Sequence, residues 1–198
     1  MKKTLLSILI VFLIFIGNAQ PPLKTGKLKV SDNGRYLQYE NEQPFFWLGD
    51  TGWLLFSKTN REDADKYLTD RATKGFNVIQ VMVLHSLDAK NIYGDPALIK
   101  QNVANPLVTD GNVFEDSTQY DYWDNVDYVV DKAAEKGIYI AMVPVWGSNV
   151  RSGKVSKTDA VKYASWLANR FKNRPNIIWL NGGDIMGSDS LDTWNAIG

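Results

Sequence analysis

The chain contains no cysteine and a single histidine, His85, among its 198 residues. Without cysteine it has no disulfide framework, no thiolate zinc site and no cysteine nucleophile. One histidine also excludes a His-rich metal site, and the G-x-S-x-G sequence that a serine hydrolase triad would need is absent. The sequence therefore indicates neither a metal nor another cofactor.

The chain also lacks an excess of either charge, because 22 basic side chains are balanced by 22 acidic ones. A protein that tracks nucleic-acid phosphates carries a basic excess, so we expect no nucleic-acid partner. Tryptophan, in contrast, is plentiful, with seven residues in this length. Flat aromatic faces suit sugar rings, although packing is the commoner role for any one tryptophan.

The first 19 residues have the pattern of a secretory signal peptide. Two lysines follow Met1, an apolar run covers residues 5–16, and small residues form a cleavage site that ends at Ala19. The run is shorter than the roughly 20 residues that a membrane-spanning helix needs. We expect cleavage after Ala19, export to the periplasm or the outside of the cell, and no stable membrane insertion afterwards.

The next part of the chain predicts a β-hairpin. Residues 27–30 and 36–39 alternate polar and apolar side chains around the Asn33-Gly34 pair, which tolerates the positive φ angles of a tight turn. We expect this hairpin to cover the floor of the domain. The first strand of the main sheet is predicted to follow it at residues 45–48.

From there the chain repeats an apolar run, a polar loop, an amphipathic helix and a Gly or Asn stop. The predicted helices cover residues 61–74, 120–136 and 157–172, with Asn60 and Ser156 as N-caps of the first and third. The predicted strands between and after them cover residues 76–84, 138–145 and 176–180. This alternation requires a parallel sheet with right-handed crossovers.

Two α/β architectures satisfy the alternation, a doubly wound sheet and a (β/α)8 TIM barrel. The barrel is favoured because no G-x-G-x-x-G follows the first strand, and because polar and aromatic side chains follow every strand. Only about the first four βα units are present, against eight in a complete barrel of roughly 250 residues. We therefore interpret residues 20–198 as the N-terminal portion of a longer TIM-barrel domain.

The segment from Asn176 to Asp184 is the strongest candidate for chemistry. A short apolar strand runs into Asn181-Gly182-Gly183-Asp184, which delivers a carboxylate just beyond the strand end. Catalytic groups of α/β barrels lie at that end, and a carboxylate there can act as general acid or base on a glycosidic bond. Asp184 is the predicted catalytic residue; the alternatives are that it caps the next helix or lies solvated in a loop.

Five further side chains are predicted to bind substrate because each follows a strand: Asp50, Trp53, His85, Trp146 and Asn181. The carboxylate of Asp50 can hold sugar hydroxyls, with a structural ion pair as the alternative. His85 can donate to a hydroxyl or be a satisfied core histidine. Trp53 and Trp146 are predicted stacking surfaces, and Asn181 can orient the substrate or a second carboxylate. The loop at residues 86–119 is predicted to be a solvated wall beside them.

Four motifs taken together carry a family resemblance: Gly49-Asp-Thr-Gly-Trp53, Lys74-Gly-Phe-Asn-Val78, Tyr122-Trp123 and Trp179-Leu-Asn-Gly-Gly-Asp184. In this order they resemble the apiosidase-like glycoside hydrolases, glycoside hydrolase family 140, over residues 23–198. The resemblance implies a (β/α)8 barrel that acts on apiose-containing pectin side chains. The family's acid/base Asp falls on Asp184, and its nucleophile Glu, after a seventh strand, has no counterpart in these residues.

The leading hypothesis is therefore an exported glycoside hydrolase with an oligo- or polysaccharide substrate. The alternative is a non-catalytic carbohydrate-binding barrel that keeps the aromatic rim but lacks one carboxylate. A sugar lyase or isomerase is a third option, but it would need a metal or a cluster of Lys or His that the sequence does not contain.

Overall fold

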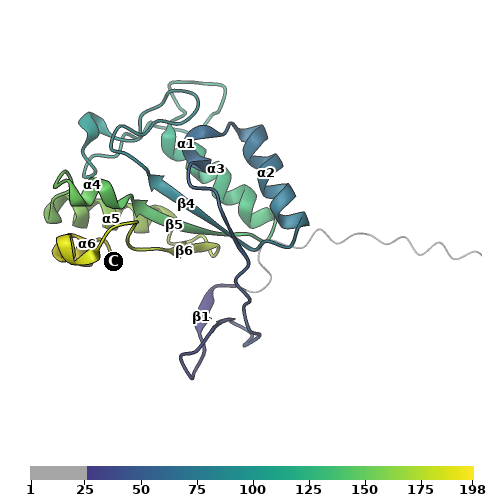
Figure 1. Cartoon of the computed structure of the whole chain (residues 1–198). Helices are drawn as coiled ribbons and strands as arrows, with labels where there is room; N and C mark the ends of the chain where they lie inside the picture. Colours follow the sequence, from purple (N-terminus) through teal and green to yellow (C-terminus); the bar gives the residue numbers. More distant parts are fainter. Residues whose placement is uncertain (1–25) are drawn as a thin grey trace, which may run out of the picture.

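A computed structural model describes residues 26–198, so the predicted signal peptide lies outside the described residues. The centre of the structure is a parallel sheet with the strand order β3-β4-β5-β6. Its strands are β3 (Gly49–Thr51), β4 (Val78–Leu84), β5 (Tyr139–Val145) and β6 (Ile177–Trp179). Figure 1 shows β4, β5 and β6 side by side in the middle of the molecule. The predicted parallel sheet is confirmed.

Six α-helices and two short 3-10 turns accompany the sheet in the described part of the chain. They are α1 (Leu55–Lys58), α2 (Arg61–Thr73), η1 (Ile99–Gln101), α3 (Tyr122–Glu135), α4 (Gly147–Arg151), α5 (Lys157–Phe171), η2 (Gly187–Ser190) and α6 (Leu191–Ile197). Buried side chains of α2, α3 and α5 form one core cluster with alternate residues of β4 and β5, among them Ile79, Val81, Ile140 and Met142. These helices therefore cover one face of the sheet, whereas a doubly wound sheet has helices on both faces.

The two predicted helix starts at Asn60 and Ser156 are confirmed. The Oδ1 of Asn60 accepts a hydrogen bond of 2.7 Å from the backbone N–H of Asp63, and the Oγ of Ser156 accepts one of 3.1 Å from Asp159. Each contact satisfies a backbone donor that the first turn leaves without a helical partner. The remaining long helix, α3, begins two residues later than predicted, because Asp121 forms its capping box.

The other face of the sheet carries the hairpin of β1 (Leu28–Val30) and β2 (Leu37–Tyr39), drawn below the sheet in Figure 1. Phe45 is buried between Tyr39 and Tyr139, with ring centroids 5.3 Å and 5.4 Å away. The hydroxyl of Tyr139 donates a 2.8 Å hydrogen bond to the carbonyl of Gly26. Because Tyr139 begins β5, the hairpin covers the amino-terminal ends of the strands, as predicted.

The prediction of the first strand at residues 45–48 was wrong, because the strand is β3 at Gly49–Thr51. Before β3, the side chain of Asn77 also bonds to the segment that was predicted as the strand. Its Oδ1 accepts from the N–H of Leu48 at 2.9 Å, and its Nδ2 donates to the carbonyl of Phe46 at 2.7 Å. Pairing of the strands begins only beyond these side-chain bonds.

The loop that follows β4 is packed in its first half, so the prediction of a solvated wall is wrong there, whereas residues 108–119 are mostly exposed. Its residues Ala97 and Val103 are buried in the main core. The indole N–H of Trp123 donates to the carbonyl of Ala97 at 3.0 Å. The Arg61 guanidinium lies 4.1 Å from the ring centre of Phe114, another loop residue. These contacts hold the loop against α2 and α3.

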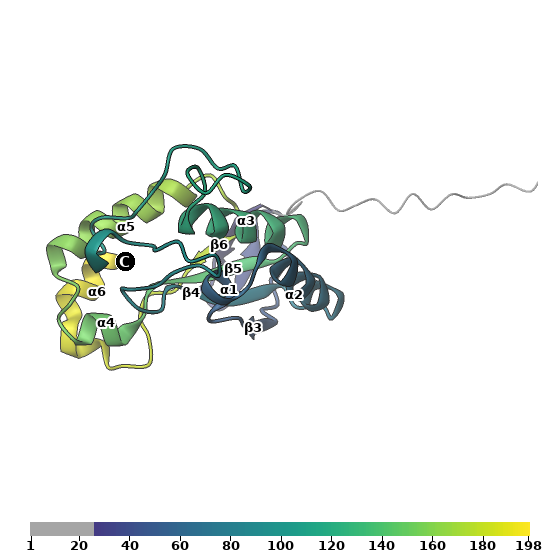
Figure 2. The same cartoon turned by 90° about the horizontal axis from the view of Figure 1, so that it is seen from above.

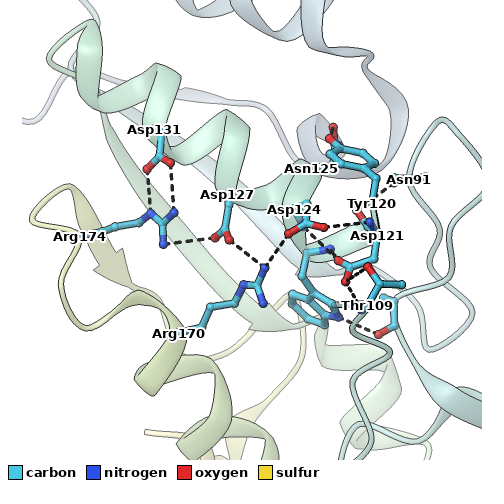
Figure 3. Close-up of polar contacts among 12 residues, drawn as sticks. Asn91, Thr109, Tyr120, Asp121, Asp124, Asn125, Asp127, Asp131, Arg170 and Arg174 are labelled. Atoms are coloured by element: carbon cyan, nitrogen blue, oxygen red, sulfur yellow. Dashed lines mark hydrogen bonds and ion pairs between the residues drawn. The ribbon is translucent and has the colours of Figure 1, made fainter. Parts of the chain in front are cut away.

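An ion network joins α3 to the end of α5, as Figure 3 shows. The guanidinium of Arg170 contacts Asp124 at 3.3 Å and Asp127 at 2.8 Å. Arg174 contacts Asp131 at 2.8 Å and Asp127 at 3.3 Å. Burial, followed by the nearby charge of Asp121, raises the pKa of Asp124. The network fixes α5 on α3 just before the chain enters β6.

Candidate active site

The carboxyl-terminal ends of the four parallel strands bring four predicted site residues to one edge of the sheet. Trp53 follows β3, His85 follows β4, Trp146 follows β5, and Asp184 follows β6. Figure 2 shows α4, which begins after Trp146, on the same side of the molecule as α6, which follows Asp184. We call these four residues the rim.

Trp53 and Trp146 form an aromatic pair on the rim. Their ring centroids are 5.5 Å apart and their planes are inclined by 55°. The backbone holds both residues, since the carbonyl of Trp53 accepts from Met82 at 3.0 Å and the N–H of Trp146 donates to Leu84 at 2.9 Å. Both side chains are half-buried, so part of each indole remains accessible for contact with a sugar ring.

Two glycines allow the loop after β6 to lie directly on the loop after β5. A Cβ on Gly183 would lie 2.6 Å from the backbone nitrogen of Gly147 and 3.6 Å from the indole Cε3 of Trp146. A Cβ on Gly147 would lie 2.8 Å from the Cγ1 of Ile185. This close approach places Asp184, between Gly183 and Ile185, next to the loop that carries Trp146.

The side chain of Asp184 is exposed and caps no helix. The short turn η2 has Met186 at its N-cap and α6 has Ser190, and neither makes a side-chain capping bond. The structure therefore has no helix cap at Asp184, whereas an exposed side chain in a loop agrees both with a catalytic role and with the other alternative, a solvated loop residue. The carboxylate makes no hydrogen bond or ion pair with the described residues, which leaves it available to a ligand.

His85 lines a cavity of about 470 Å³ together with Ser57, Lys58, Ser86, Asp88 and other residues of the loop after β4. Burial, followed by the positive charge of Lys58, lowers the pKa of His85, and the charge of Asp88 acts in the opposite direction. The imidazole is therefore neutral at pH 7, with one nitrogen able to donate and one to accept.

The structure does not bring Asp50 to the rim. Its carboxylate accepts hydrogen bonds of 2.9 Å from the hydroxyl of Tyr67 and 2.9 Å from the guanidinium of Arg71, both on α2. Burial alone would raise the pKa of Asp50, but the hydrogen bonds from Thr51 and Tyr67 and the charge of Arg71 lower it. This geometry favours the alternative interpretation, a structural ion pair.

Asn181 is likewise engaged elsewhere. Its side-chain nitrogen donates a 2.9 Å hydrogen bond to the carbonyl of Trp194 in α6. The contact ties the end of β6 to the following helix. Since it uses the amide nitrogen, the oxygen is the part of Asn181 that remains to orient a substrate.

Sequence reasoning missed one residue that contacts the rim, Asn149 in α4. The residue is 9% exposed, and its Nδ2 donates to the carbonyls of His85 at 3.2 Å and Trp146 at 3.3 Å. The preceding segment Pro144–Ser148 gives no motif that marks Asn149. Only the three-dimensional structure shows that it joins two of the predicted site residues.

Among residues 26–198 there is no group of three or more His, Cys, Asp or Glu that could hold a metal ion. Within the same range, no helix has the length and apolar character needed to cross a membrane.

The fold and the rim define an α/β protein of the glycoside hydrolase type: a parallel sheet, helices on one face, and a carboxylate and aromatic rings after successive strands. Comparison with families narrows this class. The chain belongs to the family of apiosidase-like catalytic domains, whose family model matches residues 31–198.

Two similar solved structures are described as glycoside hydrolases. One described as a glycoside hydrolase is 45% identical, with a TM-score of 0.78, over 89% of this chain and 38% of its own. A glycoside hydrolase family 5 structure from Bacteroides vulgatus ATCC 8482 is 44% identical, with a TM-score of 0.77, over 89% of this chain and 37% of its own.

A more distant structure shares the fold. An endocellulase from Pyrococcus horikoshii, solved with cellotetraose, is 16% identical, with a TM-score of 0.51, over 77% of this chain and 41% of its own. The chain thus spans well under half of the length of these structures. No curated protein matches it.

Proposed function

We propose that this chain is the N-terminal portion of an exported glycoside hydrolase that acts on apiose-containing, pectin-type polysaccharide of plant cell walls. The observation that carries the proposal is the position of Asp184, an exposed carboxylate after β6 whose loop contacts the loop of Trp146. The family and the glycoside hydrolase structures support the reaction class. Export rests on the signal-peptide pattern of residues 1–19.

We further propose that the four strands are the first half of a (β/α)8 barrel. The placement of α2, α3 and α5 on one face of the sheet supports this, because a barrel has all its helices outside. The relatives, which are longer, support it too. In this proposal the nucleophile is a Glu after a seventh strand, outside these 198 residues, and this chain alone is inactive.

In the proposed reaction Asp184 donates a proton to the leaving oxygen of the glycosidic bond. A retaining mechanism places the second carboxylate about 5–5.5 Å away, and an inverting one leaves room for water at roughly 6.5–9.5 Å. The indoles of Trp53 and Trp146 stack on a sugar ring. The neutral imidazole of His85 exchanges hydrogen bonds with sugar hydroxyls.

The decisive variant is Asp184→Asn in the full-length protein. General acid catalysis contributes about 10²- to 10⁴-fold, so we expect a loss of that order in kcat/KM on a natural glycoside. A glycoside with an acidic phenol as leaving group needs little protonation and should lose less. Asp189→Asn, an exposed aspartate of η2, is the matched control and should keep wild-type rates. Wild-type rates for Asp184→Asn on both substrates would remove Asp184 from the mechanism.

One observation favours the second candidate, a carbohydrate-binding protein without turnover. Asp184 is the single carboxylate among the predicted site residues that the structure brings to the rim, whereas glycoside hydrolysis uses two. Binding of pectin oligosaccharides by the full-length protein without any release of reducing sugar would favour this candidate. Release of sugar that depends on Asp184 would favour the hydrolase.

A further inference from the structure

Asn149 occupies an unusual position between the ends of two strands. It lies in α4, directly after β5, yet its side chain reaches the backbone of His85 at the end of β4. A second bond from the same nitrogen goes to Trp146, three residues earlier. The side chain therefore joins the two strand ends that carry the predicted hydrogen-bonding residue and the predicted stacking surface.

The two bonds also fix which end of the amide faces away. The Nδ2 of Asn149 lies within hydrogen-bond distance of two carbonyl oxygens, which can only accept. A flipped amide would set its oxygen against those two oxygens, so the orientation is determined by the partners. The remaining atom, Oδ1, accepts no hydrogen bond from the described residues. The Oδ1 atom is also not fully buried, so solvent or a ligand can reach it.

We propose that the Oδ1 of Asn149 accepts a hydrogen bond from a hydroxyl of the sugar that stacks on Trp146. The inference rests on the proposed function, and it adds a binding residue that the sequence did not reveal. An acceptor held in place by two fixed bonds needs no rearrangement to receive a hydroxyl. A neutral hydroxyl–amide bond contributes about 0.5–1.5 kcal/mol, which corresponds to roughly 2- to 12-fold in binding.

The fold offers a matched control in Asn125 of α3. This asparagine is also buried, and its Nδ2 donates to the carbonyl of Phe56 at 2.9 Å. Its Oδ1, however, already accepts from the hydroxyl of Tyr120 at 3.2 Å. Asn125 thus makes the same kind of structural bonds, but it is fully buried and its oxygen already has a partner, so no ligand reaches it.

The experiment compares Asn149→Ala and Asn125→Ala in the full-length protein on a cleavable glycoside and its monodeoxy analogues. Both variants should lower the melting temperature, because each removes buried hydrogen bonds. For one sugar position, deoxygenation should raise KM about 3- to 10-fold in the wild type and in Asn125→Ala, and hardly at all in Asn149→Ala. Asn149→Ser, which is smaller and can still donate one bond, provides the same comparison if Asn149→Ala does not fold.

The outcomes separate this inference from the proposed function. If neither Asn149 variant loses sensitivity to any deoxy position, Asn149 is only a clamp and the proposal is overturned. If Asn149→Ala loses sensitivity to deoxygenation at one position and Asp184→Asn loses activity as expected, both the sugar contact of Asn149 and the proposed function are supported. If Asp184→Asn keeps full activity while Asn149→Ala loses sensitivity at one position, the sugar contact stands and the assignment of Asp184 fails.

Discussion

Replacement of Gly183 by alanine tests whether the contact between the loops after β5 and β6 sets the position of Asp184. The added Cβ would lie 2.6 Å from the nitrogen and 2.9 Å from the Cα of Gly147, short of the 3.4 Å at which ordinary contact begins. Both neighbours are backbone atoms, so one loop must move by roughly 0.8 Å to relieve the nitrogen contact. Gly183 does not have a left-handed φ, so this steric overlap is the whole perturbation.

Overpacking of this kind costs about 1–3 kcal/mol of folding free energy. A misplacement of about 1 Å at a reacting group costs on the order of 10²-fold in rate. We therefore expect Gly183→Ala to lower the free energy of unfolding in urea by that amount and kcat/KM of the full-length protein by about 10- to 100-fold. Gly187→Ala is the control, because no atom lies within 4 Å of the added Cβ and its φ is not left-handed. Equal behaviour of the two variants would refute the reasoning.

Two further predictions concern charges around the site. Arg170→Met leaves the buried Asp124 without a cation, so we expect the free energy of unfolding at pH 7 to fall by about 3 kcal/mol. Arg151→Met is the near-neutral control, because Arg151 is exposed and has no ion pair among residues 26–198. The folded-state pKa of Asp124 is raised above its unfolded value, so protonation favours the folded state and the deficit should shrink as the pH falls toward 4, measured by urea denaturation. Lys58→Met should raise the pKa of His85, measured by NMR titration, because it removes a nearby positive charge. Because the folded-state pKa of His85 is lowered in the wild type, the free energy of unfolding falls as the pH drops below about 6.5. The Lys58→Met variant should lose less of this free energy over the same pH range.

The parts of the fold that depend on local rules could be predicted from the sequence. Asn60 and Ser156 cap their helices through bonds to residues three positions along, so a short stretch of sequence contains the whole interaction. Gly75 and Gly137 adopt φ angles of +85° and +73°, as the predicted helix stops require. The parallel sheet followed from the alternation of these helices with apolar strands.

The first strand shows where local rules stop. Side chains alternate between the two faces of a strand, so the face of Asp50 depends on where pairing begins. The sequence placed Asp50 beyond the strand, in a loop at the rim. In the structure it is the middle residue of β3, and its side chain points to Tyr67 and Arg71 on the helix side. The side-chain bonds of Asn77 to the segment before β3 join residues 29 and 31 positions apart, and no local pattern reveals them.

At the rim, too, the residues with reactive or binding groups could be predicted from the sequence, whereas the residues that set the distances between them could not. Asp184, Trp146 and His85 were predicted because their types suit sugar chemistry and each follows a strand. Their separations are set by Gly183 against Gly147 and by Asn149 between two carbonyls. The role of such a glycine can be identified only once the neighbouring backbone is known. The role of a buried amide likewise depends on knowing which carbonyls it contacts. If Gly183→Ala and Asn149→Ala each change turnover or sugar discrimination more than their loss of stability explains, then the spacing of the rim, and not only its composition, determines activity.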